Sequence, residues 1–172
     1  MTPEYNELNN RIAEIGVNFQ AMLDPDPSKH FDNKSQDIIR AYVLLCHAEF
    51  EKYFEDITRN TLTNIYTTTQ KSRYVKKYKS AFNKQFELFY NIIERNNGIK
   101  LENIDKILSL CGFEKSNLTS DYIQKLNQLG KKRGNLAHNG GGSLTTLLSF
   151  SQEKNEVDWL TKETLTNVDN YF

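Results

Sequence analysis

Residues 40–57, RAYVLLCHAEFEKYFEDI, carry apolar and aromatic side chains at three- and four-residue steps. This spacing is typical of a helix that buries one face along its length. We therefore predict a long helix that begins at about Lys34, and we expect the threonine-rich residues 61–69 to fray its end. The positions expected on its apolar face are Ile39, Val43, Cys46, Phe50, Tyr53 and Ile57.

The residues before this long helix indicate an N-terminal helix followed by a turn. Thr2 is expected to be the N-cap of an N-terminal helix within residues 1–30, and Pro3 suits its first position. An apolar stripe runs from Tyr5 to Met22 on this helix. Residues 24–33, DPDPSKHFDN, form the connector, because their two prolines disfavour helix on their N-terminal side.

The chain after the long helix predicts only further helices. A third helix is expected over residues 71–98, and a short fourth helix is stopped by Gly112. Ser120 is expected to cap a fifth helix that runs to Asn139, and the tail 141–172 holds one short element and a last helix. No segment alternates with period two. We predict an all-α protein, a compact helical bundle of about five to six helices in a single domain, residues 1–172.

Composition narrows the class of protein. The 172 residues suit one domain with a core, and the longest uncharged apolar run, AYVLLC at 41–46, is too short to span a membrane. The N-terminus does not resemble a signal peptide. Cys46 and Cys111 stand alone in apolar settings, which indicates reduced thiols in a cytoplasmic protein. No metal-binding motif is present, so we expect no metal and no cofactor.

The charges balance in total but are segregated along the chain. The 22 basic and 22 acidic side chains divide into net −5 over residues 1–60, net +8 over 61–140 and net −3 over 141–172. The neutral total argues against indiscriminate binding of nucleic acid, whereas the basic middle segment allows one anionic partner at one face. Folding can also intermix these charges in space, and the sequence leaves that alternative open.

The stretch KKRGNLAHNGGG, residues 131–142, holds the candidate catalytic pair Arg133 and His138. Histidine both accepts and donates a proton near neutral pH, and the arginine guanidinium fits phosphate oxygens. Such a pair suffices for RNA cleavage without a metal. Five positions separate the two residues, so they point about 140° apart on an ideal helix. The alternative is a basic helix end stopped by Asn-Gly, and spacing alone favours it.

The order of segments resembles the HEPN superfamily, and within it the bacterial RiboL-PSP-like HEPN nucleases. The resemblance rests on RAYVLLCHAEFEKYFEDI, LENIDKILSLCGF and LNQLGKKRGNLAHNG, and covers roughly residues 34–140. It implies a metal-independent endoribonuclease, active as a homodimer with the active site at the interface. Arg133 would hold the scissile phosphate and His138 would transfer protons. A bacterial defence or toxin–antitoxin system, with an antitoxin or defence partner protein, is the implied setting.

Three supporting residues follow from the same resemblance. Glu51 stands where related proteins often carry an acid, and His47 shares its helix stripe. Glu51 can equally be the ordinary i,i+4 partner of His47. For His47 itself, packing at the boundary of the core is favoured over a catalytic role. The position after Arg133 is usually polar in such motifs, but here it is Gly134. Either Asn135 takes that role, or the contact is missing and activity is reduced.

Residues 71–84, KSRYVKKYKSAFNK, contain six basic side chains and no acid, interleaved with aromatic side chains. Lysines meet phosphates and aromatic rings stack on unpaired bases, so the stretch suits single-stranded RNA. An amphipathic helix with buried rings and solvated lysines is the alternative. The residues expected to bind RNA are Arg73, Tyr74, Lys76, Lys77, Tyr78, Lys131 and Lys132.

Two other functions remain open at this point. One is a catalytically inactive HEPN-like module that binds RNA or a nucleotide, with Gly134 marking a degraded site. The other is a helical protein-interaction domain in which the motif is only a helix end.

Overall fold

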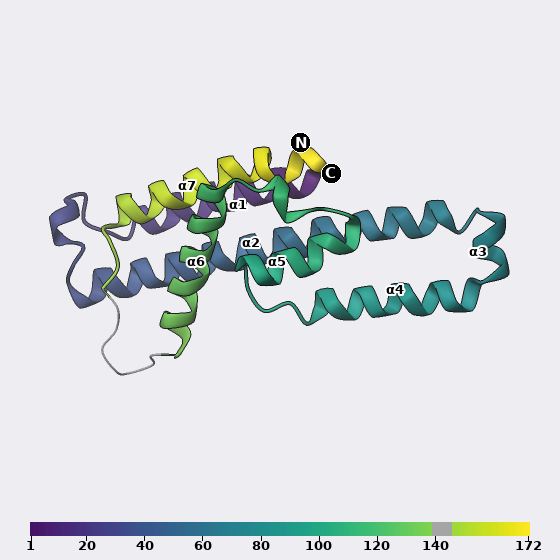
Figure 1. Ribbon diagram of the computed structural model, residues 1–172. Coiled ribbons are helices and arrows are strands. Elements are labelled where there is room, and N and C mark those ends of the chain that lie inside the picture. The colour runs from purple at the N-terminus through teal and green to yellow at the C-terminus, as the bar shows by residue number, and fades with distance from the viewer. Residues whose placement is uncertain (139–145) are drawn as a thin grey trace.

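A computed structural model of the chain describes residues 1–138 and 146–172, without the side chains of Arg73, Tyr74 and His138. The described part contains seven α-helices, four short 3-10 helices and no strand (Figure 1). The predicted all-α bundle is therefore confirmed. None of the described helices is long and apolar enough to cross a membrane.

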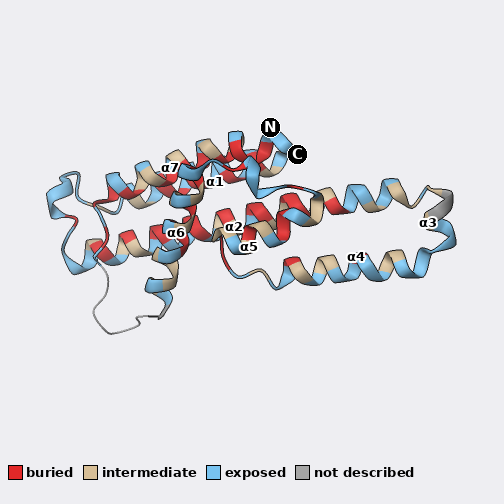
Figure 2. Cartoon of the chain, in the orientation of Figure 1, coloured by how far each residue is buried: buried red, intermediate tan, exposed pale blue. Residues whose placement is uncertain are grey.

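Helix α2, Asn33–Thr69, is the element against which most others pack (Figure 1). At 1.5 Å per residue its 37 residues extend about 55 Å. Helices α1, Pro3–Gln20, and α7, Phe150–Asn167, pack against each other and against α2. The buried positions of α2 form one continuous face (Figure 2). All six positions expected on that face are buried, together with Tyr42, Phe54 and Leu62.

The predicted fraying of α2 over residues 61–69 is wrong. The helix continues to Thr69, and several of its threonine hydroxyls donate to a carbonyl one turn earlier in the same helix. Thr63 bonds the carbonyl of Arg59 at 2.8 Å, and Thr67 bonds that of Thr63 at 3.0 Å. Each hydroxyl is thereby satisfied within the helix and does not compete for the backbone.

The expected third helix is two helices. A short α3, Arg73–Lys77, and α4, Lys79–Glu94, are separated by Tyr78, whose backbone leaves the helical region at φ −115° and ψ 28°. Helix α4 also ends four residues before Gly98. It folds back along the second half of α2, and together with α3 these segments form a projecting hairpin, which we call the arm (Figure 1).

Aromatic packing holds the arm together. Tyr66 of α2 stacks on Phe82 of α4 with ring centroids 5.6 Å apart, and Phe86 lies 4.9 Å from Tyr66. The Tyr66 hydroxyl donates to Asn83 at 3.0 Å. Of the rings within residues 71–84, Phe82 is partly buried in this cluster, whereas Tyr78 is 59% exposed.

Helix α5, Leu101–Leu108, continues into the 3-10 turn Ser109–Cys111 and stops at Gly112, as predicted. Gly112 adopts a left-handed φ of 81°, which favours glycine. Helix α6, Ser120–His138, begins one residue earlier than expected, because Ser120 is its first helical residue and not its cap. Its cap is Thr119, whose hydroxyl accepts from the backbone N–H of Tyr122.

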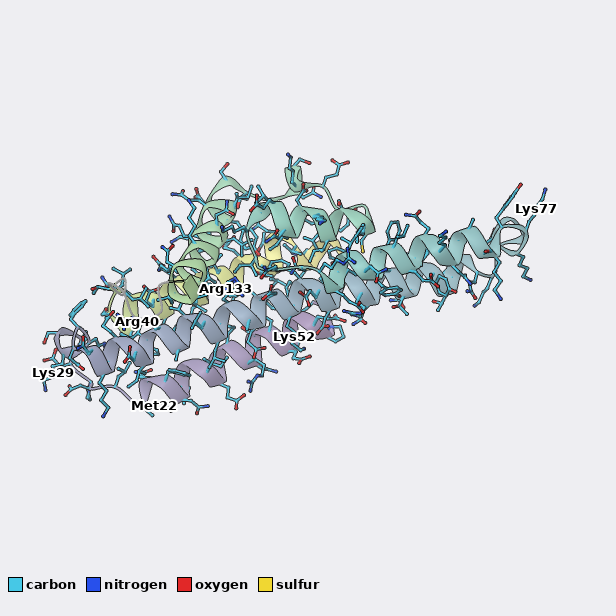
Figure 3. All side chains as sticks on the ribbon, turned by 90° about the horizontal axis from the view of Figure 1, so that it is seen from below. Met22, Lys29, Arg40, Lys52, Lys77 and Arg133 are labelled. Atoms are coloured by element: carbon cyan, nitrogen blue, oxygen red, sulfur yellow. The ribbon has the colours of Figure 1, made fainter. Side chains whose placement is uncertain are left out.

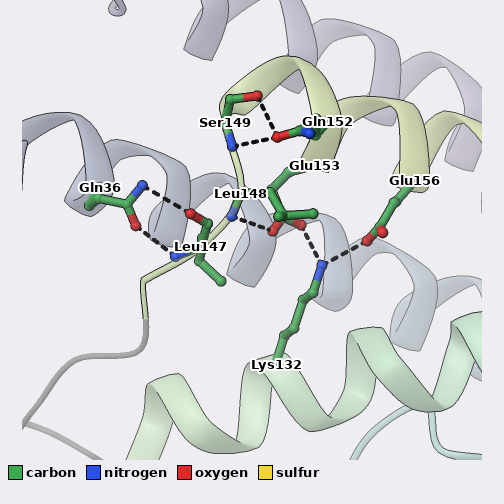
Figure 4. Close-up of polar contacts among 8 residues, drawn as sticks. All are labelled: Gln36, Lys132, Leu147, Leu148, Ser149, Gln152, Glu153 and Glu156. Atoms are coloured by element: carbon green, nitrogen blue, oxygen red, sulfur yellow. Dashed lines mark hydrogen bonds and ion pairs between the residues drawn. The ribbon is translucent and has the colours of Figure 1, made fainter. Parts of the chain in front are cut away.

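The residues before α7 are fixed by polar contacts with α2. The Gln36 side chain accepts from the N–H of Leu147 at 2.7 Å and donates to its carbonyl at 3.3 Å (Figure 4). Ser149 and Gln152 form a capping box at the start of α7. These contacts fix the start of α7 at Phe150.

The two ends of the chain meet at Asp169, which is 1% exposed. Its carboxylate accepts from the backbone N–H of Thr2 at 2.9 Å and from the Thr2 hydroxyl. The N-terminal ammonium lies 3.7 Å away, and the Tyr53 hydroxyl donates at 3.4 Å. Thr2 also caps α1 as predicted, because its hydroxyl accepts from the N–H of Tyr5.

We expect Asp169→Ala to lower the free energy of unfolding by about 2–3 kcal/mol, because it leaves Thr2 and Tyr53 without their shared buried acceptor. Urea unfolding measures this loss. Asp158→Ala is the control, since Asp158 pairs with Lys154 at an exposed position and should cost less than about 1 kcal/mol. Equal losses in the two variants would contradict the role given to Asp169.

Candidate active site

A pocket of about 400 Å³ lies where three segments meet. Helix α2 contributes His47, and the link between α4 and α5 contributes residues 97–100. Helix α6 contributes residues between Gly130 and Asn135. Its lining carries the cations Lys100, Lys131 and Arg133 and one carboxylate, Glu102. The pocket is therefore positively charged and suits an anion.

Helix α6 approaches the α4–α5 link closely at Gly130. A Cβ on this residue would stand 2.9 Å from Cγ of Lys100, which is closer than two carbons pack. One turn earlier, the Asn127 side chain accepts from the N–H of Leu101 at 2.9 Å and caps α5. These two contacts set the distance between the walls of the pocket.

Arg133 is the cation of the predicted motif, and it lines the pocket together with His47. Figure 3 labels its place on the chain. Its side chain comes from α6 and is half-buried. Its positive charge is near enough to help lower the pKa of His47. A guanidinium in this position can hold a phosphate that enters the pocket.

His47 is buried and neutral at physiological pH. Burial first, and the charge of Arg133 second, lower the pKa of its imidazole to about 4. Nδ1 lies 3.9 Å from a carboxylate oxygen of Glu51, one turn further along α2. The two supporting residues expected on α2 thus lie side by side, and His47 lines the pocket with Arg133.

The motif residues around Arg133 divide between two sides of α6. Lys131, Gly134 and Asn135 line the pocket. The ammonium of Lys132 instead pairs with Glu153 and Glu156 of α7, each at 2.7 Å (Figure 4). This pairing fixes α6 to α7, so we leave Lys132 out of the residues proposed to bind RNA.

The family model described as RiboL-PSP-HEPN matches residues 59–168. The chain belongs to this family. No curated protein and no solved structure matches the chain at a significant level. The match includes all of α6 with its motif, while His47 and Glu51 lie before it. The expected family-like core, residues 34–140, overlaps the matched range from residue 59 to 140.

In this HEPN chain the side chain of His138 lies outside the described residues. The structure shows only that the backbone of α6 reaches His138. The second half of the Arg-x4-His pair therefore stays a prediction.

The arm carries the other group of residues expected to bind RNA. Lys76, Lys77 and Tyr78 are exposed at its tip, and the ammonium of Lys77 lies 5.4 Å from the centre of the Tyr78 ring. The side chains of Arg73 and Tyr74 are not described. The end of α2 lies about 33 Å beyond His47 along the helix axis, so these residues do not reach the pocket.

The sequence did not point to the wall formed by the α4–α5 link. Gly98 has a φ of +116°, and Asn103 donates to the carbonyl of Asn97 at 3.0 Å, which braces the turn. The dipeptide Asn97-Gly98 is a turn signal, but nothing local shows that α6 closes over it. In the described part of the HEPN chain, no group of three or more His, Cys, Asp or Glu side chains is placed to hold a metal ion.

Two glycines of α6 should respond in opposite ways to the same substitution. A Cβ at Gly134 meets no atom within 4 Å, so Gly134→Ala should raise the free energy of unfolding by about 0.5–1 kcal/mol. Gly130→Ala should lower it by about 1–3 kcal/mol, because the methyl group would collide with Lys100. Urea unfolding of both variants checks the pair, and a gain in both would show that α6 does not contact the link closely.

The pKa of His47 predicts a loss of stability in mild acid. The unfolded chain binds this proton near pH 6.5, whereas the folded chain binds it near pH 4. Between these values the unfolded state holds more protons, so stability falls as the pH is lowered through this window. We expect this proton to lower the free energy of unfolding by about 2 kcal/mol at pH 4.5 relative to pH 7. Urea unfolding at both values should show this loss in the native protein and not in His47→Phe.

Proposed function

We propose that this HEPN chain is a metal-independent endoribonuclease whose active site is the pocket at Arg133. The main support is that Arg133 lines a cationic pocket of about 400 Å³. It lies in α6, the helix that bears the motif and falls within the family match. Lys100 and Lys131 line the same pocket and would attract the RNA backbone. Family membership adds to this support, because the resemblance to HEPN nucleases implies the same activity.

The reaction needs one phosphate held in place and two proton transfers. The 2′-hydroxyl of RNA attacks the adjacent phosphorus, so that a 2′-O–P bond forms and the P–O5′ bond breaks. Arg133 would neutralise the charge on the phosphoryl oxygens as it grows. His138 would transfer the proton that the departing 5′-oxygen requires. The products are an RNA end with a 2′,3′-cyclic phosphate and a new 5′-hydroxyl.

A homodimer with the active site at its interface is part of the proposal. Leu44 and Leu45 of α2 are exposed at 37% and 46%, and Leu44 stands one turn before His47. Leucines at such positions suit burial against a second copy. The two-fold axis would bring two Arg133 side chains to one cleft. We further propose that the protein serves a bacterial defence or toxin–antitoxin system, as its resemblance to such nucleases implies.

Substitutions in the motif test the catalytic proposal. Arg133→Gln and His138→Ala should each reduce cleavage of single-stranded RNA at least about 100-fold, with unfolding transitions close to that of the native protein. Arg95→Gln, at an exposed arginine outside the pocket, is the matched control. EDTA should leave the rate unchanged, and mass spectrometry should detect the cyclic phosphate.

Other results would support another function. Salt-sensitive RNA binding without any cleavage would indicate the inactive binding module instead. Unchanged cleavage by His138→Ala would exclude that residue from proton transfer. A strictly monomeric protein in light scattering, active at that concentration, would contradict the shared cleft.

We propose that the arm is a second contact for the same RNA, through Lys76, Lys77 and Tyr78. A stacked strand advances about 3.4 Å per nucleotide, so the separation of about 33 Å corresponds to roughly ten nucleotides. Lys76→Glu with Lys77→Glu should weaken binding of a 20-nucleotide RNA and reduce its salt slope by about 1.4. A four-nucleotide RNA should be unaffected. The control is the double variant Lys106→Glu with Lys115→Glu, which changes the net charge by the same amount outside the arm. If it weakens RNA binding as much as the arm variant does, the arm is not a specific contact.

A further inference from the structure

His47 is a buried polar side chain without a hydrogen bond among the described residues. Its side chain is only 3% exposed, and a carboxylate oxygen of Glu51 lies 3.9 Å from Nδ1, which is beyond hydrogen-bond distance. Buried polar groups are normally bonded, so an imidazole in this state indicates a partner that enters from outside. The pocket is the open space that it lines.

The opposite nitrogen of the ring, Nε2, faces the pocket wall at Gly98. A Cβ on Gly98 would stand 3.8 Å from Nε2 and 3.9 Å from Cε1. Glycine is favoured there by the φ of +116°, so Gly98 itself places no side chain against this edge of the ring. The hydrogen bond between Asn103 and Asn97 holds the turn in this position.

The charges around the ring favour one tautomer. Glu51 lies on the Nδ1 side, which favours the hydrogen on Nδ1 and leaves a lone pair on Nε2. Burial and the charge of Arg133 disfavour a second proton on the ring, and Lys131 and Lys100 line the same pocket. Glu102 is the one acid in that lining. The pocket thus presents a cation for phosphate and, beside it, a hydrogen-bond acceptor.

We propose that Nε2 of His47 accepts the hydrogen bond, and then the proton, of the ribose 2′-hydroxyl next to the phosphate held by Arg133. The proposal rests on the proposed function for its substrate. In the reaction the 2′-hydroxyl proton moves to Nε2 as the 2′-O–P bond forms, and His138 gives its proton to the departing 5′-oxygen. The imidazolium that results is stabilised by Glu51, and the bound phosphate offsets the charge of Arg133. The same contact selects ribose over deoxyribose.

Binding of two small probes tests the contact without any cleavage. Adenosine 3′-monophosphate should bind about 3- to 10-fold more tightly than its 2′-deoxy counterpart, as measured by calorimetry, because one hydrogen bond distinguishes them. His47→Phe keeps an aromatic ring and removes the acceptor, so the preference should disappear. His47→Gln retains an acceptor oxygen and should keep the preference, while losing cleavage because an amide takes no proton.

His30→Gln is the matched control, since His30 is 4% exposed and lies away from this pocket. It should leave the preference for the ribose form unchanged. No preference in the native protein, or a preference that survives in His47→Phe, would overturn the proposal.

The same variants separate this proposal from the proposed function. If the native protein cleaves RNA and His47→Phe cleaves equally well, the role of His47 fails while the nuclease stands. If no RNA is cut but the ribose preference depends on His47, the contact stands and the nuclease fails.

Discussion

The burial of one face of α2 is the constraint on which the rest of the structure depends. A helix of 37 residues cannot hide that face alone, and other helices cover different parts of it. Helix α1 packs along it from Tyr42 to Asn60, and α7 packs beside α1. Helix α4 folds back on its far end, where Tyr66 stacks on Phe82. The pocket lies at His47, where α6 and the α4–α5 link meet on α2.

The pocket contains groups whose burial is unfavourable in free energy and that the surrounding fold holds in place. An imidazole buried without a hydrogen bond and a cation beside a neutral histidine each cost free energy. Contacts outside the pocket offset them, such as the Asn127 cap on α5 and the pairing of Lys132 with α7. Rigid surroundings of this kind let charged groups face a ligand without rearranging.

Much of the fold could be predicted because its signals are local. Periodic apolar residues identify α1 and α2, and Gly112 ends α5 as its left-handed backbone requires. The break at Tyr78 and the persistence of α2 through its threonines escaped prediction, since both depend on backbone geometry that residue types do not specify. For the site, the motif identified Arg133, but the α4–α5 wall depends on contacts between residues distant in sequence. Gly130 against Lys100 is one such contact, and Lys132 with Glu153 is another.

The junction at Asp169 has a practical meaning for engineering. Both chain ends meet in one corner of the bundle, on the side where α1 begins and α7 ends (Figure 1). A domain whose ends adjoin can be inserted into a surface loop of a host protein, because host and guest then need only two short joins. Residues added before Met1 would turn its ammonium into an amide, while both contacts of Thr2 with the carboxylate remain possible. The domain is thus suited to serve as a cassette within chimeric sensors.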